Sequence, residues 1–283
     1  MLILFILILI IIILYTITGS AEDMLKIFQW NILALPYFNH TSYNSYKKNI
    51  FNIKNRNKLI YNKIKQLAQL EYVICLQEID EYTWLMIQPI LVNYTALWAP
   101  YGVMGILVAV PAKYKVIDKV EILIDRRWLI MCKTDKFVIA SYHAPLIKIP
   151  YTTDIDEIKQ NENIKKTTTE FMNYAGSMLA YFAGDFNMIP TCLAYGALPP
   201  ALINLHKKNP RFTVNARATI VGYIDKFCDT LDYIFGLNLT DKQLKNYTIF
   251  TGDLRGMAPA AGNLYPALWH PSDHLFIDLK IAI

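Results

Sequence analysis

Short apolar runs of strand-like composition recur along this chain, and several of them stop at a single polar residue. Residues 58–70 carry apolar side chains at helical spacing, and the polar segment 154–175 is expected to form a long helix. Strands that come in runs, with helices between only some of them, favour a mixed α/β layered fold over strict alternation. The predicted strands cover residues 25–30, 72–76, 94–99, 105–110, 115–124, 128–133, 137–141, 179–183, 231–235 and 275–281.

Polar side chains follow these strands at the points where the strands end. Side chains that project from strand ends on a rigid sheet can converge on one cleft. The sequence therefore predicts one polar site at the edge of a sheet. The residues at these positions are Asn31, Glu78, His143, Asp185, Asp232 and Asp273.

Three residues of this set carry oxygen ligands. Glu78 and Asp273 supply carboxylates, and Asn31 supplies an amide oxygen. Mg²⁺ prefers such ligands and keeps several waters that a phosphate can displace. Each residue also has a plainer interpretation, since Asn31 could cap a turn and Glu78 could face solvent. The pattern predicts a magnesium site if the three side chains meet.

The remaining polar residues suit proton transfer. His143 and His274 could act as a proton acceptor and a cation, and Asp232 could orient one imidazole and favour its protonated form. Phosphoryl transfer requires a Lewis acid, an activated water and stabilisation of developing charge. The plainer alternatives are an Asx turn at Asp185 and a helix cap at His274.

Five segments carry these residues in chain order: Gln29-Trp30-Asn31-Ile32-Leu33-Ala34, Cys75-Leu76-Gln77-Glu78, Gly184-Asp185-Phe186-Asn187, Leu231-Asp232-Tyr233-Ile234-Phe235 and Pro271-Ser272-Asp273-His274. They resemble the motifs of the endonuclease/exonuclease/phosphatase superfamily, which includes deoxyribonuclease I-like nucleases and sphingomyelinases. The resemblance spans residues 26–279. It implies a four-layer α/β sandwich of two packed sheets flanked by helices, with deoxyribonuclease I-like topology.

The resemblance also implies a metal site. By this match Glu78 is the principal Mg²⁺ ligand, Asn31 is a metal-site residue and Asp273 supports the site. The implied cofactor is Mg²⁺, for which Mn²⁺ could substitute.

The same match implies catalytic roles. His274 is the general base and Asp232 orients it, while Asp185 and Asn187 position the attacking water or the leaving oxygen and contact phosphate. His143 is expected to stabilise charge in the transition state. It lies in Ser141-Tyr142-His143, where the family usually has Asn-Thr-His, so the usual supporting Asn is absent.

Within the superfamily, the motifs are most similar to those of nocturnin, Angel and carbon-catabolite-repressor type 3′ exoribonucleases. Pro190 and Tyr195, which follow the third segment, fit this subfamily. Phe227 occupies a position where some of these enzymes place an aromatic ring against a base, although it could equally be a core aromatic.

An uncharged aliphatic run opens the chain. Residues 1–17 are too short for a typical spanning helix of ~20 residues and longer than most signal-peptide cores. We expect residues 1–20 to be a cleaved signal or a retained membrane anchor, with a buried helix as the plain alternative. Residues 24–283 would then form one catalytic domain in the secretory pathway, either secreted or membrane-anchored.

The predicted function is a Mg²⁺-dependent phosphodiesterase, foremost a 3′–5′ exoribonuclease-like nuclease that favours RNA over DNA. The net charge of +5 permits a polyanionic substrate without requiring one. The cysteines lack CxxC spacing, which argues against zinc. One alternative is a sphingomyelinase-like or inositol-phosphate-type enzyme, and another is an inactive binding module on the same fold. Nothing in the sequence indicates an oligomer.

Overall fold

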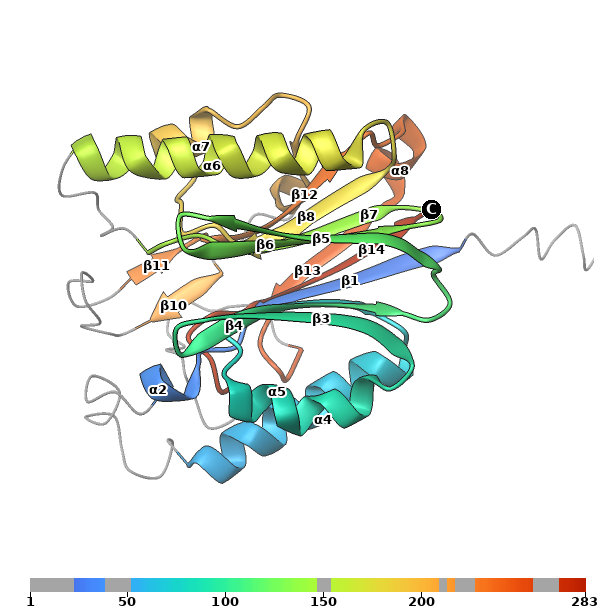
Figure 1. The fold of residues 1–283 in the computed structure, drawn as a ribbon, viewed down its shortest axis with the longest axis vertical. Coiled ribbons are helices and arrows are strands. Elements are labelled where there is room, and N and C mark those ends of the chain that lie inside the picture. Colours follow the sequence, from blue (N-terminus) through green and yellow to red (C-terminus); the bar gives the residue numbers. More distant parts are fainter. Residues whose placement is uncertain (1–22, 39–51, 147–153, 209–212, 217–226, 257–269) are drawn as a thin grey trace, which may run out of the picture.

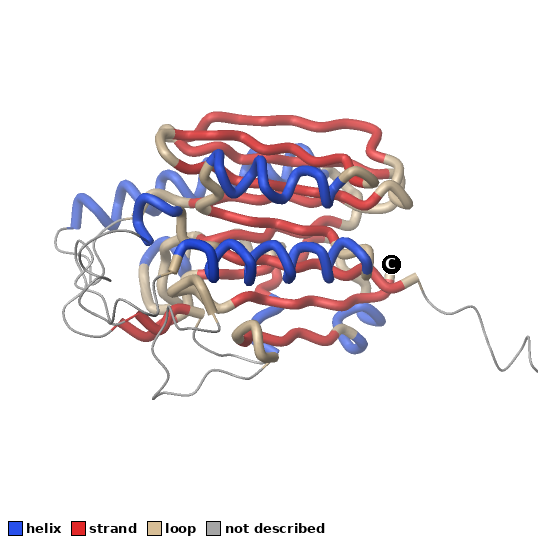
Figure 2. Tube along the Cα trace, turned by 90° about the horizontal axis from the view of Figure 1, so that it is seen from below, coloured by secondary structure: helices blue, strands red, loops and turns tan. Residues whose placement is uncertain are grey.

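The computed structural model describes residues 23–38, 52–146, 154–208, 213–216, 227–256 and 270–283. Two six-stranded sheets pack face to face, and helices cover the outer face of each sheet (Figure 1). Seen from below, the helices that cover the first sheet lie in front of strands that run alongside one another (Figure 2). The layers are helix, sheet, sheet and helix, so the predicted four-layer α/β sandwich is confirmed.

The first sheet has the strand order β13-β14-β1-β2-β4-β3. Only β1 and β2 are parallel in it, and every other neighbouring pair is antiparallel. Its strands are β1 (Met24–Asn31), β2 (Val73–Gln77), β3 (Tyr94–Tyr101), β4 (Met104–Pro111), β13 (Thr248–Gly252) and β14 (Phe276–Ala282).

The second sheet has the order β5-β6-β7-β8-β12-β9, and its single parallel pair is β7 and β8. Strands β10 (Val214–Ala216) and β11 (Phe227–Asp229) form a separate two-stranded ribbon. The strands of the second sheet are β5 (Val116–Ile124), β6 (Arg127–Thr134), β7 (Val138–His143), β8 (Ala180–Asp185), β9 (Ile203–Asn204) and β12 (Asp232–Leu237).

The parallel pairs bring polar strand ends to one edge of the molecule. In each pair both carboxyl ends point the same way, toward the left of Figure 1, where the β10–β11 ribbon also lies. Strand β12 is antiparallel to β8, so its first residue, Asp232, lies opposite Asp185. The topology therefore gathers residues from both sheets.

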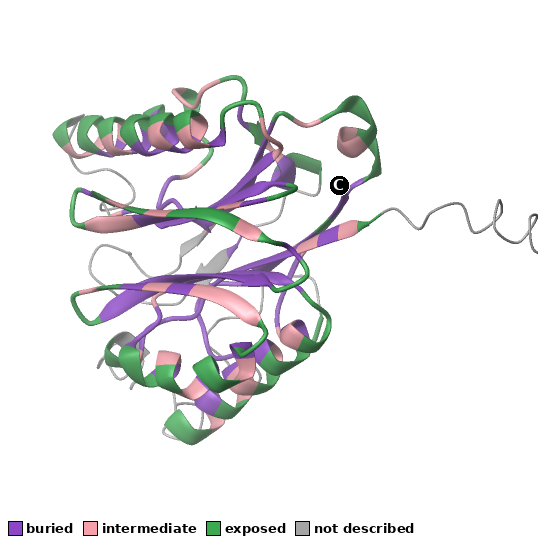
Figure 3. Cartoon of the chain, turned by 45° about the vertical axis from the view of Figure 1, so that its right-hand side comes forward, coloured by how far each residue is buried: buried purple, intermediate pink, exposed green. Residues whose placement is uncertain are grey.

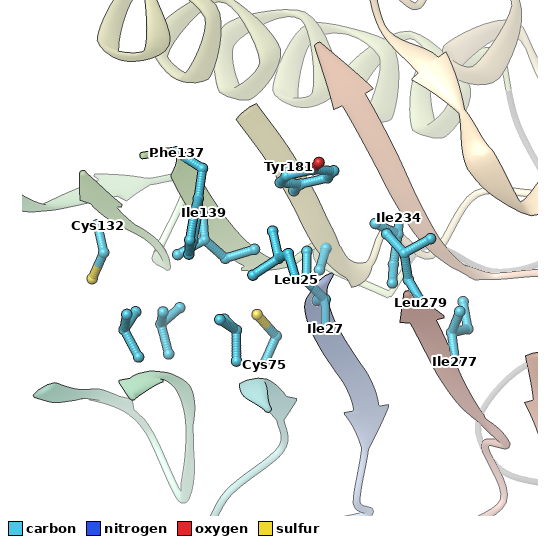
Figure 4. Packing of buried hydrophobic residues seen from close by; sticks show 14 of the residues in the cluster. Leu25, Ile27, Cys75, Cys132, Phe137, Ile139, Tyr181, Ile234, Ile277 and Leu279 are labelled. Atoms are coloured by element: carbon cyan, nitrogen blue, oxygen red, sulfur yellow. The ribbon is translucent and has the colours of Figure 1, made fainter. Parts of the chain in front are cut away.

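Apolar residues fill the space between the sheets. In Figure 4 Ile27 and Cys75 of the first sheet face Ile139 and Tyr181 of the second. Cys75 and Cys132 are free thiols within this core, as their apolar surroundings in the sequence predict. Inward-facing strand residues are almost uniformly buried, as the purple strands of Figure 3 show.

Helices α4 and α5 cover the first sheet, and α6 covers the second (Figure 1). Helix α4 begins earlier than its apolar spacing predicts, because the Asn52 side chain accepts hydrogen bonds from the amides of Lys54 and Asn55 and caps it. The helices are α2 (Leu35–Phe38), α4 (Ile53–Gln69), α5 (Glu81–Ile87), α6 (Asp154–Ala175), α7 (Leu193–Gly196) and α8 (Asp241–Asn246), with short 3₁₀ helices η1 (Gln88–Leu91) and η2 (Leu205–Lys208).

Most predicted strands agree with the structure to within a residue or two. Pro89 lies in the 3₁₀ turn that follows α5, where its missing amide hydrogen disfavours continuation of the α-helix. Strand β13 has no counterpart in the prediction, although it pairs with β14 along its whole length.

The predicted signal or anchor, residues 1–20, lies outside the described residues. Among the helices that are described, none is both long enough and apolar enough to cross a membrane.

We expect Gly184→Ala to destabilise the protein by roughly 1–3 kcal/mol or more, the usual cost of overpacking. A Cβ atom on Gly184 would collide with the backbone carbonyl of Tyr142, which cannot retreat without breaking the β7–β8 pairing. Urea unfolding measures the effect. Gly196→Ala is the matched control, since no atom lies within 4 Å of a Cβ there. Equal stability of the two variants would contradict the tight strand packing.

Candidate active site

The structure brings the predicted site residues together at the polar edge. Asn31 ends β1, and Glu78 follows β2 directly. His143 and Asp185 end the parallel pair of the second sheet, and Asp232 begins β12 beside them. Asp273 and His274 precede β14, and both are buried. Residues from both sheets thus form one cluster.

Asn31 links two carboxylates across the sheets. Its Nδ2 donates to Glu78 Oε1 at 2.9 Å and to Asp185 Oδ2 at 2.9 Å. The second oxygen of Glu78 accepts the amide of Ala34 at 3.2 Å. Asn31 therefore holds one carboxylate from each sheet in a fixed position.

Two residues of the cluster have left-handed backbone conformations. Glu78 has a φ of 55° and Asn187 a φ of 46°. Such conformations cost non-glycine residues energy and gather at functional sites. The Asn187 turn is held by its amide, which donates to Asp185 Oδ1 at 2.9 Å. The side-chain Nδ2 of Asn187 donates one hydrogen to the carbonyl of Ala144 at 2.8 Å, which leaves one for another acceptor.

His274 and Asp232 form a buried pair. His274 Nδ1 lies 2.8 Å from Asp232 Oδ2, and His274 Nε2 points toward Asp185 Oδ2 at 3.7 Å. Burial alone would lower the pKa of His274, but the carboxylates of Asp232, Asp185 and Asp273 together raise this pKa well above its usual value. Since a carbonyl can only accept, Trp30 Nε1 at 3.0 Å and His270 Nε2 at 2.6 Å both donate to the His274 carbonyl. Asp232 thus holds the ring of His274, while Trp30 and His270 hold its backbone carbonyl.

His143 has a different environment. Its Nδ1 lies 2.5 Å from the Tyr101 hydroxyl, and its Nε2 lies 3.8 Å from Glu78 and 3.7 Å from Asp185. Burial lowers the pKa of His143 well below its usual value, and the charges of Arg127 and His274 lower it further. Burial therefore favours the neutral form of this ring, although its Nε2 faces the two carboxylates.

The carboxylates of the cluster repel one another. Burial, followed by the charge of Asp273, raises the pKa of Glu78. Burial, followed by the charge of Asp232, raises the pKa of Asp185 to about 7. Buried carboxylates gathered in this way favour a divalent cation, because hard oxygen ligands are what Mg²⁺ prefers. Among the described residues, two groups of side chains could share an ion. One group is Glu78, His143 and Asp185, and the other is Asp185, Asp232 and His274.

A chain of buried amides lies beneath the cluster. Gln29 Nε2 donates to Gln77 Oε1 at 2.8 Å and to Asp232 Oδ1 at 2.8 Å. Gln77 Nε2 donates in turn to Ser141 Oγ at 3.0 Å. Both glutamines lie within the first two motif segments, and no role for their side chains is predicted from the sequence. The two glutamines are far from Asp232 in the sequence, so no local sequence pattern predicts a network that joins strands of different sheets.

Arg56 is a second residue that the sequence did not single out. It lies at the start of α4, fully buried, and its Nη2 donates to the Leu33 carbonyl at 2.5 Å. The same nitrogen lies 3.8 Å from Asp80 Oδ2, which accepts the amide of Leu35 at 2.9 Å. Arg56 therefore ties the loop after Asn31 to the loop after Glu78.

Phe227 begins β11, but its side chain lies outside what the structure describes, so its predicted contact with a base stays a prediction.

No family model matches the sequence. No curated protein matches it either.

Solved structures do match the fold. The human nocturnin catalytic domain with bound sulfate is 19% identical, with a TM-score of 0.65 over 92% of this chain and 97% of that one. Danio rerio TDP2 in complex with a single-stranded DNA product is 15% identical, with a TM-score of 0.64 over 93% and 100%. ANGEL2, a 2′,3′-cyclic phosphatase in complex with adenosine-2′,3′-vanadate, is 13% identical, with a TM-score of 0.63 over 93% and 97%.

An endonuclease/exonuclease/phosphatase family protein from Bacteroides thetaiotaomicron is 14% identical, with a TM-score of 0.61 over 92% of this chain and 95% of that one. At these identities the likeness concerns the fold. Nocturnin and ANGEL2 are of the types that the sequence motifs favoured. The chain has the fold of the endonuclease/exonuclease/phosphatase superfamily.

Proposed function

We propose that this protein is a divalent-metal-dependent phosphodiesterase that hydrolyses nucleic acid, with RNA favoured over DNA. One observation carries the proposal: two carboxylates and two imidazoles from four separate chain segments meet, with Asp185 Oδ2 3.7 Å from Nε2 of both His143 and His274, and Glu78 Oε1 3.8 Å from His143 Nε2. Structural needs alone do not explain this gathering, because buried like charges destabilise a fold.

The residues that would hold the cation are Glu78, which belongs to a possible ion-binding group with Asp185 and His143, and Asp273, whose charge raises the Glu78 pKa. Asn31 orients Glu78 through its amide. The ion, Mg²⁺ or Mn²⁺, would polarise the scissile phosphate and offset its charge. Asn31 Oδ1 accepts the amide of Leu33 at 3.0 Å, so this oxygen is already directed into a turn. The side-chain nitrogen of Asn31, and not this oxygen, bridges the carboxylates of Glu78 and Asp185.

His274 is proposed as the general base. Asp232 accepts from Nδ1, so Nε2 is the nitrogen that would take a proton from water. The charge of a bound divalent cation would offset the carboxylates that raise the His274 pKa, and the ring could then release its proton and act as a base. Asp185 Oδ2 lies 3.7 Å from Nε2 of both His274 and His143. It is placed to orient a water or a leaving oxygen between the two rings. Asn187 would assist through its remaining amide hydrogen.

His143 is proposed to stabilise negative charge in the transition state. A neutral ring that accepts the Tyr101 hydroxyl at Nδ1 carries its proton on Nε2, which faces the carboxylate cluster. That hydrogen is available to an oxygen on which charge develops. Tyr101 thus takes the place of the supporting Asn that the Ser141-Tyr142-His143 segment lacks.

Several features support a polynucleotide substrate. TDP2 was solved with a single-stranded DNA product and ANGEL2 with an adenosine vanadate, so proteins of this fold accept both sugar types. The motifs favour the exoribonuclease-like subfamily, and this favours RNA. We further propose that residues 24–283 form the catalytic domain and that residues 1–20 direct it to the secretory pathway or to a membrane.

His274→Ala and Glu78→Gln should each lower hydrolysis of a labelled oligoribonucleotide by ~10²–10⁴-fold, because each removes a group that acts in the transition state. Turnover under saturating substrate measures the loss. Thermal unfolding checks that each variant is folded. Glu121→Gln, an exposed change on β5, is the matched control. Near-normal turnover of either variant would refute the assignment.

Mg²⁺ should raise the melting temperature of the wild type, because a bound cation relieves the repulsion among Glu78, Asp185 and Asp273. EDTA should abolish activity, and Mg²⁺ or Mn²⁺ should restore it. Differential scanning calorimetry with and without Mg²⁺ measures the shift. Glu78→Gln should show a smaller shift, and an equal shift in both proteins would place the ion elsewhere.

Substrate preference tests the class of substrate. Poly(A) or mixed RNA should be cleaved faster than DNA of matched length in Mg²⁺. Faster cleavage of sphingomyelin or an inositol phosphate would replace the nuclease assignment with the lipid or small-molecule alternative. Wild-type protein that hydrolyses no phosphodiester would indicate a binding module.

A further inference from the structure

A cleft of about 640 Å³ lies beside the cluster described above. One wall is the turn between β3 and β4, and the opposite wall is the turn between β5 and β6, which carries Arg126 and Arg127. Lys159 of α6 completes the lining. Arg126 and Lys159 have no place in the proposed chemistry, and Arg127 enters it only through its charge near His143.

The charge of this cleft is predominantly positive. Its three cations face one acidic residue, Asp125. The Asp125 carboxylate already accepts a hydrogen bond from Asn163 of α6 at 3.0 Å. The cleft therefore suits an anion, and guanidinium groups match the geometry of phosphate oxygens.

Direct contacts join the cleft to the catalytic cluster. The Arg127 guanidinium lies over the Tyr101 ring, 4.5 Å from its centroid. The Tyr101 hydroxyl in turn bonds to His143 at 2.5 Å. Trp128 Nε1 donates to the Pro100 carbonyl at 2.8 Å, which fixes the two walls against each other. An anion in the cleft would therefore be separated from the scissile phosphate by the Tyr101 ring.

The turn that carries Arg126 is strained. Asp125 and Arg126 have φ values of 45° and 64°, the pair of left-handed conformations for which hairpins prefer Asn-Gly. An arginine at the second position costs energy that a glycine would save. Strain of this kind gathers at ligand clamps. The side chain of Arg126 therefore has a use that the turn itself does not require.

We propose that this cleft binds a second phosphate of the substrate, one that neighbours the scissile phosphate along a polynucleotide strand. Arg126 and Lys159 contact this phosphate, and Arg127, held on Tyr101, sets the inner limit of the cleft. The inference rests on the proposed phosphodiesterase function and deepens it. A substrate with a single phosphate leaves the cleft empty, so the protein should select chains over isolated diesters.

The test compares two RNA substrates that differ in phosphate number. A dinucleoside monophosphate offers the scissile phosphate alone, whereas a hexanucleotide offers neighbours on either side of most linkages. Arg126→Gly removes the cation and relieves the strained φ, and Lys159→Ala removes the cation that α6 contributes to the lining. Lys65→Ala removes an exposed cation from α4, on the other outer layer, and serves as the matched control.

Wild-type protein should prefer the hexanucleotide in kcat/KM. Arg126→Gly and Lys159→Ala should each reduce this preference roughly tenfold, the effect of losing one charge-assisted contact. The slope of log KM against log salt should flatten by about 0.7 per variant, since each releases one fewer counterion. Thermal unfolding confirms that both variants fold, and Lys65→Ala should match wild type in both measurements.

Equal losses on both substrates, or losses no larger than that of Lys65→Ala, would overturn the second-phosphate site. Wild-type protein that cleaves neither substrate would instead refute the phosphodiesterase function itself. Selective loss on an inositol bisphosphate, with the hexanucleotide unaffected, would likewise refute a polynucleotide strand as the occupant.

Discussion

Two buried glutamines, Gln29 and Gln77, join the two sheets beneath the candidate site. Gln29 Nε2 donates both of its hydrogens, one to Gln77 within its own sheet and one to Asp232 of the other. In an apolar interior these groups have no water to replace a lost partner, so any slip of one sheet against the other would leave them unsatisfied. The amide network therefore fixes the relative register of the sheets where the chemistry is proposed to occur, and it directs Asp232 toward His274.

The electrostatics of the cluster follow from that constraint. The sheets bring Glu78, Asp185, Asp232 and Asp273 into a buried space that holds more negative charge than His274 can balance. The fold tolerates this because backbone amides, Asn31 and the Arg56 clamp hold the carboxylates and their loops in place. The positions of these side chains and their negative charge thus both favour a cation that binds a phosphate.

The sequence was most informative where a local pattern and a long-range contact coincide. Apolar runs that stop at Asn31, Glu78 and Asp185 predicted both the strands and the edge where they meet, because carboxyl ends of parallel strands converge. Strand β13 was missed, since its pairing with β14 depends on a partner distant in the chain. The role of Tyr101 against His143 was missed for the same reason: it replaces a residue of the β7 motif from another sheet.

The position of β14 shapes how activity arises during folding. This strand lies between β13 and β1, yet Ile277 pairs with Gln29 across almost the entire described chain. Closing so long a loop is entropically costly and slow, so β14 is expected to dock late. His274 and Asp273 immediately precede it and reach their positions only when it docks. A nascent or partly folded chain would therefore lack the proposed catalytic centre, which would be complete only when the whole sandwich has closed.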